Sequence, residues 1–248
     1  MALVAAHPDD ESIGASALLA RCPNACVIFV TDGAPQDRKL WPKAIEGARE
    51  QYAAIRRQEA ERALAHAGIP ARQITWLGGV DQGAIFTVPQ LLPRLVDWID
   101  ELRPELLVTH PYEGGHPDHD CAALLASLAL SPFLVPVPRF EMTSYHARDG
   151  RLVTGEFLGT NPAEEWRFEL SSEDKTRKRK MFDEYPSQQG VLESFRIDCE
   201  RFRLAPAYDF RKPPHEGKLW YECLGWPMTG ERWRALAATR PEQELSCR

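Results

Sequence analysis

Two acidic segments that contain histidine hold the side chains best suited to chemistry. The first is AHPDDE at residues 6–11, and the second is HPYEGGHPDHD at residues 110–120. Histidine and carboxylate groups are the donors of a catalytic zinc site, which uses three protein ligands and leaves one position open for water. Amide hydrolysis at such a site also needs a base that is not a ligand, and a donor that stabilises the oxyanion. The two segments contain enough groups for all of these tasks.

The spacing within each segment suggests a division of labour. His7 and Asp10 are three residues apart where an expected helix begins, so both side chains can face the same side. Asp9 then points elsewhere, toward the open coordination position, as a base should. His116 and His119 have the same spacing, so one can bind the metal while the other faces the substrate.

Strands and helices alternate in the first half of the chain. Apolar runs predict strands, and amphipathic or capped segments predict helices between them. The expected strands are 2–7, 25–33, 73–79 and 105–111, and the expected helices are 12–21, 46–67, 88–102 and 117–130. This pattern predicts a Rossmann-like, doubly wound α/β fold, with helices on both faces of a mostly parallel sheet of order 3-2-1-4-5. The first and fourth strands are neighbours in that order, so the loops that follow them open into one crevice.

We expect a single domain over residues 1–248. Residues 1–138 form the Rossmann-like core, and residues 139–248 form a C-terminal elaboration that shapes the substrate pocket. Within it we expect a strand at 139–146 and a hairpin or cap segment at 149–159.

Further along, a helix is expected at 172–184, and the Pro-, Trp- and Tyr-rich remainder is not assigned. The basic run from Lys175 to Lys180 could suggest a phosphate site. Because Glu173 and Asp174 precede it, a solvated helix face is the preferred interpretation. The aromatic residues of 220–233 are expected in the core, with a sugar platform as the alternative.

Composition excludes several classes of function. The formal charge of −6 and the pI of about 5.7 argue against a nucleic-acid partner, which needs a basic surface. No apolar stretch reaches the ~20 residues that span a bilayer. The N-terminus lacks the basic region of a signal peptide, which predicts a cytoplasmic location. A small-molecule substrate fits best, and a homo-oligomeric assembly stays open.

These residues resemble the de-N-acetylases of the N-acetylglucosaminyl-phosphatidylinositol type, the PIG-L or LmbE-like family. AHPDDE and HPDH both match the family motifs without substitution, each after a strand, and the resemblance covers roughly the first 120 residues. It implies one zinc ion per chain, with ferrous iron as the alternative in the cell. It also implies that His7, Asp10 and His119 are the metal ligands.

The same resemblance implies roles for three further residues of the motifs. Asp9 is the general base, and His116 stabilises the oxyanion or protonates the leaving amine. Asp118 lies next to the ligands and orients His116.

Weaker similarities imply substrate contacts. Arg56 and Glu59 resemble an RxxE pattern whose arginine contacts substrate hydroxyls. Asp81 resembles a substrate-contacting aspartate, although the sequence here is GVDQG where the family more often has Asp-Gly. The segment YPSQ at 185–188 resembles a tyrosine-to-Ser-Gln pattern, and Gln188 is given no role.

The sequence therefore predicts zinc-dependent hydrolysis of an N-acetyl amide on an amino sugar or similar small glycoconjugate, with the water on the metal activated by Asp9. One alternative is an amidase that uses the same residues to cleave a larger acyl group or a thiol conjugate. A non-haem iron oxygenase is another, because His7-x-Asp9 with a distant histidine imitates a facial triad. A non-catalytic metal-binding domain is the last, and it leaves Asp9 and His116 without a role.

Overall fold

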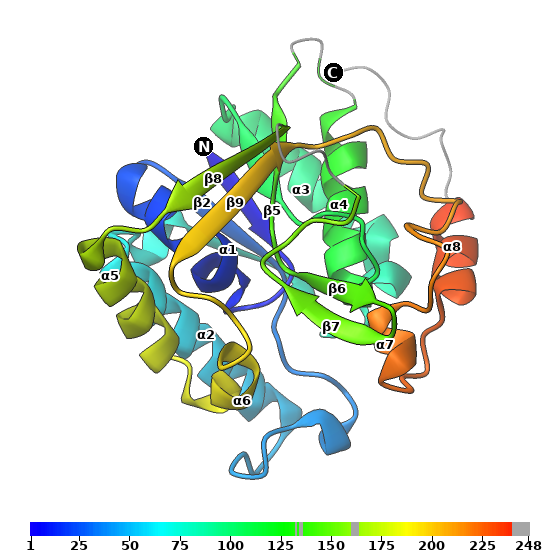
Figure 1. Ribbon diagram of the computed structural model, residues 1–248, viewed down its shortest axis with the longest axis horizontal. Helices are drawn as coiled ribbons and strands as arrows, with labels where there is room; N and C mark the ends of the chain where they lie inside the picture. Colours follow the sequence, from blue (N-terminus) through cyan, green and yellow to red (C-terminus); the bar gives the residue numbers. More distant parts are fainter. Residues whose placement is uncertain (132, 134–135, 160–163, 240–248) are drawn as a thin grey trace.

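The computed structural model describes residues 1–131, 133, 136–159 and 164–239 (Figure 1). A seven-stranded sheet has the order β3-β2-β1-β4-β5-β9-β8, and its first five strands are parallel. This confirms the predicted order 3-2-1-4-5 and extends it by two antiparallel strands. The strands are β1 (Ala2–Ala5), β2 (Cys26–Thr31), β3 (Ile74–Gly79), β4 (Leu107–Thr109), β5 (Arg139–Met142), β8 (Glu165–Glu169) and β9 (Cys199–Leu204).

Helices cover both faces of the sheet, α1, α2 and α5 on one and α3, α4 and α8 on the other (Figure 1). The helices are α1 (Asp10–Arg21), α2 (Arg49–His66), α3 (Val88–Leu102), α4 (Pro117–Leu130), α5 (Ser172–Asp183), α6 (Gln189–Leu192), α7 (Trp220–Cys223) and α8 (Gly230–Ala238). Successive β1 residues alternate between the two cores, with Leu3 on the α1 face and Val4 on the α3 face. That burial on both faces is why β1 is wholly apolar. Every described helix is too short or too polar to traverse a lipid bilayer.

The parallel pairing of β1 with β4 brings the two motif segments together. Ala2 lies opposite Leu107 and Leu3 opposite Val108, so both strands end at the same edge of the sheet. Helix α1 begins at Asp10, just beyond β1, and α4 begins at Pro117, after the loop that follows β4. The crevice expected from the sequence is therefore formed by these two segments.

The strand predicted at 139–146 is two strands. It breaks after Met142, and β6 (Tyr145–Arg148) leaves the main sheet to pair with β7 (Arg151–Thr154). This hairpin turns at Asp149 and Gly150, whose φ angles of 54° and 71° are both positive, as a type I′ turn requires. The hairpin predicted at 149–159 therefore exists but begins earlier, and period-2 patterning alone did not locate the break.

Strands β8 and β9 were not predicted, and Arg203 of β9 ties this part of the sheet to the loop after β4. Its Nε donates to Glu141 Oε2 at 2.7 Å, and its Nη2 donates to Glu113 Oε1 at 3.0 Å. The guanidinium also lies 4.2 Å from the centre of the Phe157 ring. Glu113 is three residues before His116, so the C-terminal half anchors the loop that carries the second motif.

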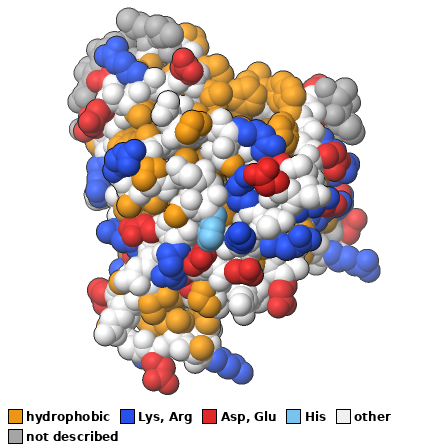
Figure 2. Space-filling view, turned by 90° about the vertical axis from the view of Figure 1, so that its left-hand side faces the viewer, with side chains coloured by type: hydrophobic (Ala, Val, Ile, Leu, Met, Phe, Trp, Pro, Cys, Tyr) orange, Lys and Arg blue, Asp and Glu red, His pale blue; other side chains and the backbone are white. Residues whose placement is uncertain are grey.

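The basic run on α5 is mostly a solvated face, as expected, and Lys178 is the exception. Figure 2 shows basic and acidic side chains interspersed on the side of the molecule where Figure 1 places α5. Lys178 is fully buried, and its Nζ donates to Ile13 O at 2.6 Å and to Glu200 Oε1 at 3.3 Å. Glu200 also accepts from Ala17 N, so Ile13 O is released from its helical partner at a kink in α1. Lys178 satisfies the released carbonyl.

We predict that Lys178→Met destabilises the protein by about 3–5 kcal/mol, because the substitution leaves the Glu200 charge buried without its partner. Denaturant unfolding measures the change. Lys180→Met on the exposed side of the same helix is the matched control, and it should change the free energy of unfolding by less than about 0.5 kcal/mol. Equal stability of the Lys178 variant and the unmodified protein would contradict this account of the buried pair.

Candidate metal centre

Three buried side chains from the two motifs converge beyond the ends of β1 and β4. Asp10 Oδ2 lies 3.4 Å from His7 Nδ1, and Asp10 Oδ1 lies 3.2 Å from His119 Nε2. One ligand atom from each of the three residues lies within 4.8 Å of the others. Burial lowers the pKa of His119 to about 3, so its ring stays neutral and can donate a lone pair. The geometry therefore brings together the His, Asp and His residues expected as ligands.

The outward nitrogens of both histidines are held by other side chains. His7 Nε2 lies 3.1 Å from Asp118 Oδ2, and His119 Nδ1 lies 3.2 Å from Ser144 Oγ. Asp118 is itself fixed by the backbone N–H groups of Gln82 and Ala84, at 2.6 and 3.1 Å. Such partners fix the tautomer and the ring orientation of metal-binding histidines.

His116 is oriented by the backbone of Asp118 and not by its carboxylate. The Asp118 N–H donates to His116 Nδ1 at 3.1 Å, whereas Asp118 Oδ2 is 4.0 Å from that nitrogen. The contact between the two residues is thus made by the backbone of Asp118, because its carboxylate is turned to His7. Burial and the neighbouring His7 lower the pKa of His116 to about 3. A neutral ring that accepts at Nδ1 carries its proton on Nε2, which leaves Nε2–H free to donate.

Asp9 lies beside the donor set without belonging to it. Its φ of 117° and ψ of −29° are left-handed, a conformation that costs about 1–2 kcal/mol for a residue other than glycine. Its Oδ2 lies 3.1 Å from Arg56 Nη2. Burial raises the pKa of Asp9 to about 7; the Asp10 charge acts in the same direction, and Arg56 acts to lower it. A carboxyl group with a pKa near neutrality suits proton transfer in both directions.

Arg56 forms part of the cavity wall, and its guanidinium is held by two backbone carbonyls, the Ser187 hydroxyl and the carboxylates of Asp9 and Glu59. It is 2% exposed, and its Nη1 lies 3.3 Å from Glu59 Oε2. Ser187 braces Glu59 in turn, with its Oγ donating to Glu59 Oε2 at 2.6 Å. The Arg56–Glu59 pattern is therefore a support for Asp9, and contact of Arg56 with a substrate stays a prediction.

Asp81 enters the site from the turn after β3. Its Oδ1 lies 3.4 Å from His7 Nε2 and 3.7 Å from His116 Nε2. Although burial acts to raise the pKa of Asp81, the two histidines and Arg56 outweigh burial and lower it to about 2. Asp81 is thus a carboxylate at the cavity wall, and its contact with substrate also stays a prediction.

The charges of the site fit a divalent cation. Three carboxylates, from Asp10, Asp81 and Asp118, surround His7, and Arg56 is the one Lys or Arg side chain that lines the cavity in the described chain. Burial acts to lower the pKa of His7, but these carboxylates raise it well above its usual value. The field therefore favours positive charge here, and a His-Asp-His donor set suits zinc.

A second group of donors shares His7 and lies next to the first. It contains His7, Asp81, His116 and Asp118, again with one ligand atom from each within 4.8 Å of the others. Asp118 already accepts two backbone N–H groups, and His116 Nδ1 accepts a third. Because Asp118 and His116 are already engaged by these three N–H groups, we take the first set as the candidate cation site.

Several residues of the site were not identified from the sequence. His110 stacks on His119 with ring centres 4.0 Å apart, and its Nε2 lies 3.2 Å from Asp10 Oδ2. Trp226 meets the His116 ring edge-on at 5.0 Å, and Tyr145 meets the His119 ring at the same distance. The place of His110 before a proline at the end of a strand predicts a structural role or a position next to the metal ligands, and no catalytic role was assigned to it. No periodic pattern marked Tyr145 or Trp226, beyond the aromatic enrichment of 220–233.

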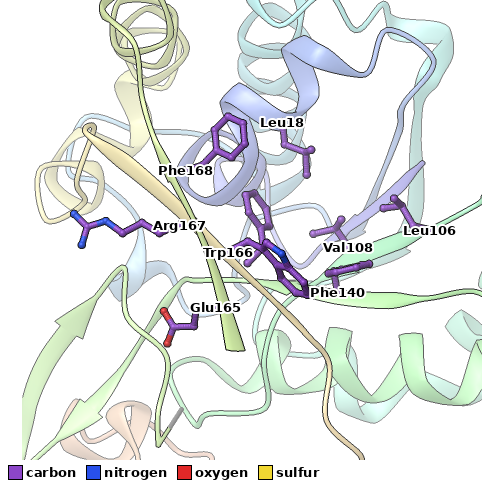
Figure 3. Close-up of a pocket in the computed structure, with 9 residues that line it drawn as sticks. Leu18, Leu106, Val108, Phe140, Glu165, Trp166, Arg167 and Phe168 are labelled. Carbon is purple, nitrogen blue, oxygen red and sulfur yellow. The ribbon is translucent and has the colours of Figure 1, made fainter. Parts of the chain in front are cut away.

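A cavity of about 170 Å³ opens onto Asp9, Arg56 and His116, and Trp226 forms part of its wall. This volume is below the ~300–1,000 Å³ of typical ligand sites, which points to a small reacting group. A larger cavity of about 730 Å³ lies elsewhere, on the α1 side of β5, β9 and β8. Its wall is mostly apolar, and Figure 3 shows the side chains of Arg167 and Glu165 directed away from the apolar cluster that includes Leu18 and Phe140.

Glycine is required at position 115 in the loop that carries His116. A Cβ atom there would lie 1.9 Å from the carbonyl oxygen of Tyr145. The close approach fixes the loop after β4 against the start of β6. The glycine directly before HPDH therefore has a steric cause.

Residues 2–130, just over half of the chain, match the family described as PIG-L, GlcNAc-PI de-N-acetylase. The chain belongs to this family. The matched PIG-L region contains all three of the proposed donors as well as Asp9 and His116. It ends before β5, so the C-terminal residues around the site lie beyond it.

Curated relatives of this PIG-L protein include two named 1D-myo-inositol 2-acetamido-2-deoxy-alpha-D-glucopyranoside deacetylase. The one from Mycolicibacterium vanbaalenii is 30% identical over 197 residues, which cover 69% of this chain and 67% of the relative. The one from Mycobacteroides abscessus is 33% identical over 153 residues, which cover 52% of this chain and 54% of the relative. The chain thus spans about half to two thirds of the length of these relatives.

Solved structures share the fold. A deacetylase of the teicoplanin biosynthetic pathway has a TM-score of 0.61 at 19% identity, covering 84% of this chain and 98% of its own. The N,N'-diacetylchitobiose deacetylase of Pyrococcus horikoshii has a TM-score of 0.57 at 17% identity, covering 83% of each chain. A 4-carboxy-2-hydroxymuconate hydratase of Pseudomonas putida reaches 0.62 at 15% identity, covering 84% and 96%. The fold therefore accommodates more than one reaction, and function must be argued from the site.

We predict that Asp118→Ala lowers the affinity for Zn²⁺ by about 10–100-fold, because His7 loses the partner that orients its ring. Competition with a chromophoric chelator measures the affinity, on samples whose melting curve shows a folded protein. Asp32→Ala is the control, because Asp32 pairs with Arg49 at 2.6 Å and lies outside the donor set. Unchanged zinc affinity in the Asp118 variant would rule out this role for its carboxylate.

Proposed function

We propose that this protein is a metal-dependent deacetylase that hydrolyses the N-acetyl amide of an amino sugar or a similar small glycoconjugate. The observation that supports this most directly is the His7, Asp10 and His119 donor set with the carboxylate of Asp9 beside it and outside it. The names of the curated relatives, which describe deacetylation of an acetamido-glucopyranoside, support the same activity.

His7, Asp10 and His119 would hold one divalent cation per chain, zinc in the first instance and ferrous iron as the alternative. When bound, this ion would polarise the acyl carbonyl and lower the pKa of a water molecule. The remaining catalytic tasks belong to side chains of the chain itself.

Asp9 accepts a proton from the attacking water and later delivers it to the leaving amine. Its pKa of about 7 suits both steps, and Arg56 at 3.1 Å keeps its carboxylate directed into the cavity. The Nε2–H of His116 donates a hydrogen bond to the acyl oxygen as negative charge develops there. Because its pKa is about 3, His116 acts as a neutral donor and not as the acid that protonates the amine.

The cavity wall favours a small acyl group on a polar, hydroxylated substrate. Arg56, Asp81 and Gln188 offer donors and acceptors for hydroxyl groups, and Trp226 offers an aromatic face for a sugar ring. The cavity of about 170 Å³ has to receive part of the sugar as well as the acyl group, so we infer that it leaves little room for an acyl chain longer than acetyl. The oxygenase alternative needs Asp9 as a ligand, whereas Asp10 occupies that place in the donor set.

Asp9→Asn should keep its bound metal and lose about 10²–10⁴-fold in kcat, because an amide cannot accept the proton. Elemental analysis measures the metal, and acetate release measures turnover. His119→Ala is the contrasting variant, and it should lose the metal together with the activity. Full turnover by the Asn variant would exclude Asp9 as the base.

A panel of substrates should separate the acetyl from the larger-acyl alternative. We expect kcat/KM for N-acetylglucosamine glycosides to exceed that for the same glycosides with an N-hexanoyl group by at least about tenfold, because four extra methylenes overfill the cavity. Amine release, which is common to both substrates, provides a single readout. Faster cleavage of the hexanoyl compounds would favour the amidase alternative.

A further inference from the structure

Asp9 occupies the position of a helix-capping residue and yet makes no side-chain cap. It directly precedes α1, where an aspartate normally accepts a bond from the first turn. Here only its backbone carbonyl serves α1, accepting from Ser12 N and Ile13 N at 3.0 Å each. The left-handed backbone of Asp9 turns the carboxylate away from the helix and toward Arg56. Something else must hold this unfavourable conformation.

Glu11 holds the backbone of Asp9. Its Oε2 accepts from Asp9 N at 2.9 Å, the bond by which a first-turn acidic residue reaches back to the capping position. Its Oε1 accepts from Ser12 Oγ at 2.5 Å and from Tyr185 OH at 2.6 Å. Glu11 is fully buried, so these hydrogen bonds determine where its carboxylate can lie.

Tyr185 reaches both supports of Asp9. It lies just after α5 and is fully buried. Its hydroxyl holds Glu11, which holds the Asp9 backbone. Its ring lies under the guanidinium of Arg56, 5.5 Å from ring centre to Cζ, and Arg56 holds the Asp9 carboxylate. Tyr185 lies beyond the family-matched region. It thus contacts both Glu11, the partner of the Asp9 backbone, and Arg56, the partner of the Asp9 carboxylate.

We propose that Tyr185, acting through Glu11, is a positioning residue for the catalytic base. The pair keeps Asp9 left-handed, so that its carboxylate faces the cavity and does not cap α1. The inference rests on the proposed function for its kinetic consequence, but its structural consequence can be tested without it. Neither Tyr185 nor Glu11 needs to touch substrate or metal.

Tyr185→Phe tests the proposal, because it removes the hydroxyl and keeps the ring under Arg56. We expect kcat to fall about 10-fold, since small misplacement of a catalytic group costs one to two orders of magnitude in rate. KM should stay within about twofold and bound metal should be unchanged. An unchanged kcat in folded, metal-loaded protein overturns the proposal.

Tyr112→Phe is the matched control, because it also removes one buried hydroxyl, which donates to Lys212 O at 2.9 Å away from Asp9. It should keep the unmodified kcat. An equal loss of kcat in both variants would mean a general effect of lost stability and would overturn the proposal. Glu11→Gln serves if the Tyr185 variant fails to fold, and it should show the same fall in kcat with KM unchanged.

Two further measurements distinguish this proposal from the proposed function. In an Asp9→Asn background, Tyr185→Phe should have no additional effect on residual turnover, because its influence passes through Asp9; an additional 10-fold loss overturns the proposal. A crystal structure of Tyr185→Phe should show Asp9 out of its left-handed conformation or its carboxylate turned from Arg56. An Asp9 that has not moved overturns the proposal, whether or not the unmodified protein releases acetate. A failure of the unmodified protein to release acetate would count only against the deacetylase function.

Discussion

The parallel pairing of β1 with β4 is the constraint on which the site depends. It sets Leu3 opposite Val108 and brings the start of α1 beside the start of α4. Asp10 then accepts from His7 N at 2.7 Å and also lies 3.2 Å from His119 Nε2. Bringing together segments about a hundred residues apart has an entropic cost. The pairing of the strands in the sheet offsets this cost, so interactions among the donors do not have to offset it.

The same convergence concentrates buried carboxylates, which would be unfavourable without compensation. Hydrogen bonds from backbone N–H groups offset the cost of burying the Asp118 carboxylate, and the charge of Arg56 offsets the cost of burying that of Asp9. The charge that remains around His7 raises the pKa of that histidine well above its usual value. A surplus of negative charge in a buried site favours a divalent cation, so the carboxylates whose burial costs stability are also the groups that support the proposed metal site.

The C-terminal half completes a site whose donors all come from the first half. Ser144 orients His119, and Arg203 anchors the loop that carries His116 through its ion pair with Glu113. Trp226 closes the cavity against His116. The region that matches the family thus contains the proposed reactive groups, while the remainder contributes side chains that contact them and line the cavity.

The sequence by itself indicated the strands, the helices and the place of the reactive groups, because apolar runs, helix starts and motif spacing are local properties of the chain. The order of the first five strands followed from the rule that alternating strands and helices form a doubly wound sheet. It also indicated that Asp9 stands apart from Asp10, since neighbours at a helix start point in different directions. Only the tertiary structure decided that the Asp118 carboxylate meets His7, that Lys178 is buried, and that β8 and β9 extend the sheet. These depend on which distant segments pack together, and the partner of a charged side chain is set by that packing and not by its neighbours in sequence.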